Sequence, residues 1–190
     1  MKMYGVAASF LALTIVFAAL AALAADVGGV KLDDKANVGG QELVLNGAGI
    51  RTRAVFKVYV GSLYLPVKTA NLEGVLAKGP RRIQLNLLRD LSGDQLSDAV
   101  NDGLKESNSP ADVEAVKGET EQFISIVKAM GPLKEGNVIS IDFVEGATKV
   151  GFNGAPKGTV TGEAFNRALT KIWVGDKPVQ PDLQKAMLGG

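Results

Sequence analysis

The stretch IRTRAVFKVYVGSLYL, residues 50–65, is rich in β-branched and aromatic residues, and Pro66 ends it. Such a run predicts one long β-strand. Alternation along the strand places Arg51 and Tyr59 on the same face. On a straight strand they would lie about 26 Å apart. A bulge or a bend would therefore be needed to bring both side chains to one small ligand.

Further strands are predicted on both sides of this stretch. A short strand over Gln41 to Asn46 would end in the turn Asn46-Gly47-Ala48-Gly49. The other strand candidates lie at 81–88, 138–144, 149–153 and 158–161. Asn153-Gly154 is a strong signal for a tight hairpin between the last two.

Helix signals lie between and after these strands. Ser92 and Gln95 form a capping box ahead of an apolar stripe. Ser109-Pro110 predicts the start of a second helix that Gly131-Pro132 ends. A long helix is expected over 163–174 and a short one over 182–188. The order of strands, helices, strands and helix predicts an α+β fold, an antiparallel sheet with helices packed on one face.

The composition excludes several classes of chemistry. The 190 residues include neither His nor Cys, which rules out Ser-His-Asp and Cys-His catalysis and the usual zinc, haem and iron–sulfur ligands. Asp94, Asp98, Asp102 and Glu106 recur at helical spacing and could bind a hard cation, but a solvated helix face is the simpler interpretation. A net charge of +1 favours neither nucleic acid nor an anionic membrane surface as a partner. No metal or cofactor is therefore expected.

The N-terminus is typical of a secretory signal. Lys2 is followed by an almost continuous apolar run that ends in Ala22-Leu23-Ala24. We expect residues 1–24 to be a signal peptide and 25–190 to be a single domain of a bacterial periplasmic or secreted protein. The alternative is an uncleaved membrane anchor, because the run approaches the roughly 20 residues that span a bilayer. After cleavage no stable membrane span is expected.

Two segments resemble the chalcone isomerase superfamily. They are Gly47-Ala48-Gly49-Ile50-Arg51 and the run from Phe56 to Leu65. The stretch from Gly162 to Gly175, with Phe165-Asn166-Arg167-Ala168-Leu169 and Ile172-Trp173-Val174-Gly175, resembles its bacterial secreted chalcone isomerase-like branch. The resemblance covers about 41–189. It implies an open-faced β-sandwich, in which a helical layer covers a large antiparallel sheet and a ligand cleft lies between them.

Members of this superfamily have two activities. Plant isomerases cyclise chalcones to flavanones with an Arg that holds the developing enolate, assisted by Thr, Tyr, Asn and Ser/Thr side chains. Related plant proteins bind fatty acids, and an Arg and a Tyr hold the ligand carboxylate. Catalysis in the isomerases requires no metal, redox cofactor or histidine, which agrees with the composition.

Carried over residue by residue, the resemblance matches the isomerase Arg to Arg51 and the strand Thr to Tyr59. The Tyr, Asn and Ser/Thr positions fall at Leu96, Gly103 and Ile172, whose side chains cannot donate hydrogen bonds. The Arg51 and Tyr59 pair instead matches the fatty-acid-binding members.

The resemblance thus favours a non-catalytic binding protein for a small lipophilic ligand. The expected ligand is a carboxylate such as a fatty acid. Arg51 and Tyr59 would hold its head group, and Leu96, Gly103, Ile172 and Trp173 would line the tail path. One alternative is an intramolecular lyase or isomerase that uses Arg51 and Tyr59 on a chalcone-like or other enone substrate. Another is a structural or adaptor protein that binds no ligand.

Overall fold

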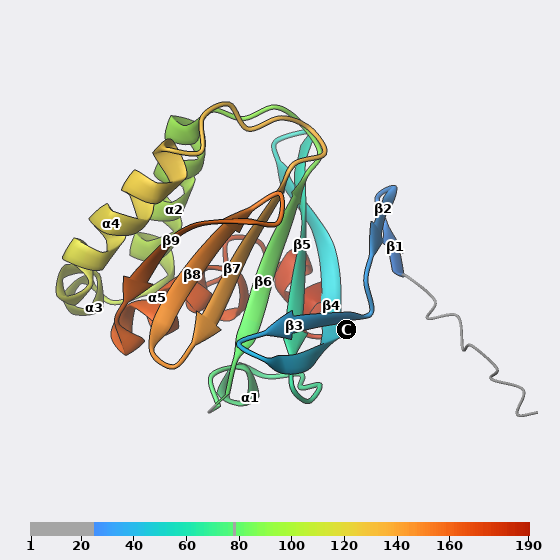
Figure 1. Cartoon of the computed structure of the whole chain (residues 1–190), viewed down its shortest axis with the longest axis horizontal. Helices are drawn as coiled ribbons and strands as arrows, with labels where there is room; N and C mark the ends of the chain where they lie inside the picture. Colours follow the sequence, from blue (N-terminus) through green and yellow to red (C-terminus); the bar gives the residue numbers. More distant parts are fainter. Residues whose placement is uncertain (1–24, 78) are drawn as a thin grey trace, which may run out of the picture.

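One antiparallel sheet of seven strands forms the body of the protein, and each strand in it pairs with its neighbours in sequence. The computed structural model describes residues 25–77 and 79–190, so the expected signal segment lies outside the described residues. The sheet consists of β3 (Lys35–Val38), β4 (Gln41–Arg53), β5 (Phe56–Leu65), β6 (Arg81–Leu87), β7 (Val138–Val144), β8 (Ala147–Phe152) and β9 (Ala155–Thr161). Strands β1 (Ala25–Val27) and β2 (Val30–Leu32) form a separate hairpin beside it (Figure 1).

Helices gather on one side of this sheet (Figure 1). They are α1 (Leu72–Val75), α2 (Gly93–Ser107), α3 (Pro110–Ala115), α4 (Lys117–Lys128), α5 (Glu163–Val174) and α6 (Pro181–Met187). No helix within residues 25–77 and 79–190 is long and apolar enough to cross a membrane. The α+β class and the open-faced arrangement are confirmed.

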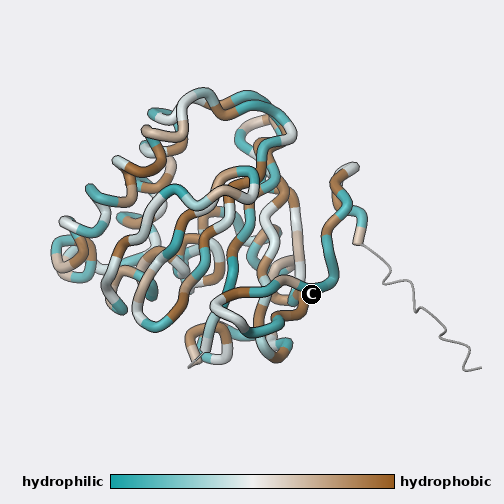
Figure 2. The backbone as a smooth tube through the Cα atoms, in the orientation of Figure 1, coloured by the Kyte–Doolittle hydropathy of each residue, from teal (hydrophilic) through white to brown (hydrophobic). Residues whose placement is uncertain are grey.

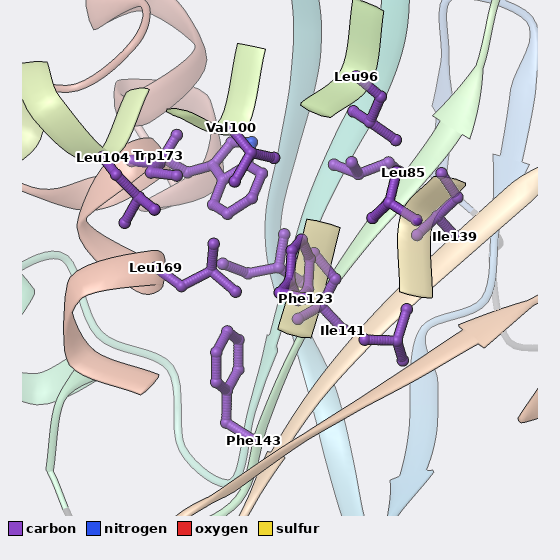
Figure 3. Packing of buried hydrophobic residues seen from close by; sticks show 14 of the residues in the cluster. Leu85, Leu96, Val100, Leu104, Phe123, Ile139, Ile141, Phe143, Leu169 and Trp173 are labelled. Carbon is purple, nitrogen blue, oxygen red and sulfur yellow. The ribbon is translucent and has the colours of Figure 1, made fainter. Parts of the chain in front are cut away.

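Side-chain alternation explains why one face of the sheet is covered and the other is open. Along β6, Ile83, Leu85 and Leu87 are buried, whereas the residues between them are only partly buried. The buried set packs with apolar residues of α2, α4 and α5 into one core (Figure 3). On the open face, Arg82 of β6 pairs with Asp142 of β7 at 2.5 Å. The coloured tube in Figure 2 shows this alternation of hydrophobic and hydrophilic residues along the strands.

The prediction of one strand over residues 50–65 was wrong. The chain reverses at Ala54 and Val55, and β4 and β5 form a hairpin in which Arg51 lies directly opposite Tyr59. Ala54 adopts a positive φ of 52°. The stretch has high β propensity throughout and contains no Gly, Pro or Asn at the reversal, so the usual turn signals were missing.

The predicted turn at Asn46-Gly47-Ala48-Gly49 was also wrong, because β4 continues through it. These glycines serve helix packing. A Cβ on Gly47 would lie 2.1 Å from the backbone oxygen of Ala186 in α6, and one on Gly49 would lie 2.7 Å from the Ala186 Cβ. The glycines of β4 therefore allow α6 to pack directly on the backbone of the strand.

The helix boundaries follow the predicted signals with one exception. Ser92 caps α2 and forms the expected capping box with Gln95, and α5 spans the predicted 163–174. The helix expected to run from Pro110 to Met130 is broken at Val116 into α3 and α4. The break buries the Val116 side chain and is followed by Gly118, a poor helix former.

Candidate functional site

A mostly apolar cavity lies between the sheet and the helices. Its volume is about 280 Å³, close to the lower end of the usual range for ligand pockets. Buried side chains from both layers line its interior, and Figure 3 shows several of them converging. Its buried apolar lining comprises Leu85, Leu96, Val100, Phe123, Val127, Ile139, Ile141 and Ile172, with Tyr59 and Trp173.

The exposed lining residues mark the mouth of the cavity. They lie at the β4–β5 turn, just after β6 and on the first turns of α2, and include Arg53, Phe56, Arg89 and Gln95. With Arg51, three arginines line the cavity, and none of its described lining residues is acidic. The electrostatic environment of the cavity therefore favours an anionic ligand.

The β4–β5 hairpin brings Arg51 and Tyr59 together at this cavity. Directly opposite residues on antiparallel strands have Cβ atoms about 4.5–5.5 Å apart, so the separation of about 26 Å expected for a straight strand does not arise. A register shift between Arg51 and Thr52 marks a bulge beside the pair. Hairpin reversal, rather than bending of a single strand, thus makes the two side chains neighbours.

Tyr59 is buried, with 8% of its surface exposed, and its hydroxyl oxygen accepts a hydrogen bond of 2.9 Å from Nε1 of Trp173. Because the indole nitrogen can only donate, the hydroxyl hydrogen of Tyr59 stays available for another acceptor. Burial raises the pKa of the Tyr59 phenol, while the bond from Trp173 and the charge of Arg51 act in the opposite direction. The phenol therefore remains a protonated donor at neutral pH.

Arg51 is half-buried and is held through one of its nitrogens. Its Nη1 donates to the backbone oxygen of Thr52 and, at 3.1 Å, to Oε1 of Gln180. Among the described residues no hydrogen bond to an acceptor is found at its Nε or Nη2, and the guanidinium also interacts with the Tyr59 hydroxyl. That edge of the guanidinium can present two parallel donors to a carboxylate.

Gln180 at the start of α6 anchors this arrangement. Its Oε1 also accepts from the Thr52 backbone nitrogen at 2.9 Å, and its Nε2 donates to the Ile50 oxygen at 3.1 Å. The side chain thus holds both the bulge in β4 and the Arg51 guanidinium. Gln180 was not predicted from the sequence, because only Pro181, a helix-start signal, marks this position.

The remaining predicted site residues fall in two places. Leu96, Ile172 and Trp173 line the cavity together with Arg51 and Tyr59. Gly103 is not among the described lining residues; it lies where α2 contacts α5, and a Cβ there would be 2.9 Å from Cγ2 of Ile172. The expected carboxylate stripe on α2 gathers no group suited to a metal ion within the described residues, and its Asp94 pairs with Lys128 at 2.9 Å.

The fold and the site define a class: an open-faced α+β protein whose apolar cavity carries a cationic and phenolic pair. The chain belongs to the chalcone isomerase-like family, whose model matches residues 24–189. The crystal structure of a fatty-acid binding protein from Arabidopsis thaliana is similar, with a TM-score of 0.62 and 15% sequence identity; the match covers 81% of this chain and 95% of that one. At this identity the likeness shows a shared fold. No curated protein matches the chain.

Proposed function

We propose that this protein binds a lipophilic carboxylate, such as a fatty acid, without chemical change. The observation that carries the proposal is the Arg51 and Tyr59 pair, which the β4–β5 hairpin places at an apolar cavity with no acidic residue in its described lining. Arg51 would receive the carboxylate on Nε and Nη2, and Tyr59 would donate its hydroxyl hydrogen. The acyl chain would lie along Leu96, Ile172 and Trp173.

The apolar interior favours binding over catalysis. Leu96 and Ile172 line the cavity at the positions that resemble the isomerase Tyr and Ser/Thr, and neither can donate a hydrogen bond to a developing oxyanion. Losing one such donor typically costs about 10²–10³ in rate. The similar fold of a protein whose title names fatty-acid binding adds support. Turnover of chalcone-like or enone substrates that disappears on Arg51 substitution would instead favour the isomerase alternative.

We also propose that the protein acts outside the cytoplasm of a bacterium, in the periplasm or secreted. The support is the pattern of residues 1–24: Lys2, an apolar run and Ala22-Leu23-Ala24. A lipophilic ligand that is sparingly soluble in water would need a carrier or store in such a compartment.

The test compares Arg51→Gln with the matched control Arg167→Gln. Arg167 is exposed on α5 and does not line the cavity. Native mass spectrometry of the purified wild type should show a bound acyl ligand, and titration with a fluorescent fatty acid should give its affinity. Because a charge-assisted hydrogen bond contributes about 1.5–3 kcal/mol, Arg51→Gln should weaken binding about tenfold or more.

The control should bind like the wild type, and a thermal melt of each variant should show that both are folded. Equal fatty-acid affinity of folded Arg51→Gln and wild type would overturn the role of Arg51. Absence of acyl binding by the wild type would overturn the proposed function itself.

A further inference from the structure

The tip of the β4–β5 hairpin, residues 53–57, exposes apolar side chains. Among the described residues three large hydrophobic side chains are exposed, and two of them are adjacent here: Val55 at 85% and Phe56 at 56%. The third, Val67 at 77%, follows the other end of β5. A single exposed apolar side chain is ordinary, but two adjacent ones at the tip of a hairpin form a small exposed apolar patch.

Three basic residues lie at or next to this apolar tip. Arg53 and Lys57 flank it in sequence, and the guanidinium of Arg89 lies 4.7 Å from the centre of the Phe56 ring. No acidic residue occurs between Glu42 and Glu73. Arg53, Lys57 and Arg89 form no salt bridge with any described residue, and Asp90 beside Arg89 is already paired with Lys134 at 2.7 Å.

The tip is also the rim of the ligand cavity. Arg53, Ala54, Phe56 and Arg89 line the cavity mouth. Figure 1 shows the β4–β5 turn at the same end of the molecule as the loop between α4 and β7, free of any covering helix. Whatever the tip contacts therefore lies directly at the entrance of the cavity.

We propose that the hairpin tip docks on the surface of a membrane that contains anionic phospholipid. Val55 and Phe56 would enter the interface while Arg53, Lys57 and Arg89 contact headgroup phosphates, the combination by which peripheral proteins bind such surfaces. The cavity mouth then faces the bilayer. The membrane contact rests on the proposed function. A lipophilic carboxylate partitions into bilayers, so it would enter the cavity from the docked membrane.

A protein partner or a second copy fits the tip less well. A stable protein interface needs about 800 Å² from each partner, and the tip offers two apolar side chains. A second copy docked tip to tip would also bring two groups of basic residues together. A bilayer surface avoids both difficulties.

The chain contains no Cys, so a single introduced cysteine can carry an environment-sensitive fluorophore. Val55→Cys reports on the tip, and Val67→Cys is the matched control on another highly exposed valine. Each labelled protein is mixed with phosphatidylcholine vesicles that contain or lack phosphatidylglycerol. Both labelled proteins are expressed and purified in the same way. If residues 1–24 are retained and bind the vesicles, they therefore contribute equally to both.

The expected result is a blue shift at position 55, and none at 67, with anionic vesicles, which weakens at high salt. Adding Lys57→Gln should lower vesicle affinity about fivefold, since one basic residue near an anionic surface is worth about 1 kcal/mol. No blue shift at 55, or equal shifts at both positions, would overturn the inference. A blue shift at position 55 that appears without vesicles as the protein concentration is raised would also overturn the inference, because it would indicate self-association.

Fatty-acid titration of the same proteins without vesicles separates the two proposals. Arg51→Gln combined with Val55→Cys should lose ligand affinity and keep the blue shift. Ligand binding without docking would remove only the membrane inference. Docking without ligand binding would leave the membrane contact standing and remove the proposed function.

Discussion

Trp173 determines the direction in which Tyr59 can donate its hydrogen bond. The indole Nε1 occupies one lone pair of the hydroxyl oxygen at 2.9 Å, and the hydroxyl hydrogen is left for a ligand. Arg51 is arranged in the same way, since Gln180 occupies Nη1 and leaves the other edge of the guanidinium open. At the residue scale, a neighbouring side chain thus holds Tyr59 and Arg51 in place, and each keeps a hydrogen-bond donor for a ligand.

Burial of Tyr59 predicts a pH dependence of stability. Its pKa is raised in the folded state, while an unfolded tyrosine titrates near about pH 10. Above that pH the unfolded chain releases a proton that the folded chain keeps, so stability falls as pH rises. Tyr59→Phe should flatten this fall. Tyr64, whose pKa burial also raises, should keep part of it, while Arg81, whose pKa burial lowers to about 10, contributes in the opposite direction.

Tyr59→Phe should also lower the free energy of unfolding at neutral pH by about 1–2 kcal/mol, because it leaves the buried Trp173 nitrogen without an acceptor. Urea unfolding near neutral pH and above about pH 10 measures both effects. An unchanged slope in Tyr59→Phe would show that Tyr59 does not titrate differently in the two states.

At the scale of elements, glycines decide how closely helices approach their neighbours. Gly103 brings α2 against Ile172 of α5, where an added Cβ would lie 2.9 Å from Cγ2. Gly118 in α4 has nothing within 4 Å of such a Cβ. The two helical glycines therefore form a matched pair that separates helix propensity from packing.

Gly118→Ala should raise the free energy of unfolding by up to about 1 kcal/mol through helix propensity. Gly103→Ala should lose this gain and cost about 1–3 kcal/mol from overpacking. Adding Ile172→Ala to Gly103→Ala should recover part of that loss, and a double-mutant cycle measures the coupling. Equal stabilisation by both glycine substitutions would mean that α2 and α5 can move apart to accommodate the added methyl group at little cost.

The contact between α6 and β4 links packing to the site. A Cβ on Gly47 would lie 2.1 Å from the Ala186 oxygen, which is backbone, so Gly47→Ala should displace α6. We expect a loss of about 2–4 kcal/mol in unfolding free energy. Because Gln180 at the start of α6 holds Arg51, fatty-acid affinity should fall as well.

Gly118→Ala serves as the comparison for this ligand effect, since Gly118 does not line the cavity and nothing lies within 4 Å of its added Cβ. Titration of both folded variants with fluorescent fatty acid provides the measurement. A Gly47→Ala protein that binds fatty acid as tightly as Gly118→Ala would argue against coupling through α6.

At the scale of the whole molecule, a meander of adjacent strand pairs builds the sheet, and the ligand cavity lies where three helices cover it. The residue pattern of 1–24 predicts cleavage after Ala24. Expression in a bacterial host should therefore yield a periplasmic protein whose intact mass corresponds to a chain that starts at Ala25. A mass that retains residues 1–24, with the protein in the membrane fraction, would favour the anchor alternative.

Several features were predictable from the sequence because their causes are local. The capping box at Ser92, the hairpin at Asn153-Gly154 and the apolar stripe of α5 depend on residues within a few positions of each other. Those elements, in their order along the chain, were enough to predict the α+β class. The short strands β1 to β3 and the helix α1 escaped prediction because three or four residues carry little periodic signal.

The site was only partly predictable. The family resemblance selected Arg51 and Tyr59, but the strand pattern placed them about 26 Å apart, since no turn residue marks the reversal at Ala54. Gln180, 129 positions from Arg51, and the packing role of Gly103 were beyond reach of the sequence. Local residue patterns were enough to predict which residue types face the core and where most elements begin. Tertiary structure alone decided which side chains meet at the cavity, because strand pairing and helix packing join positions that no local pattern connects.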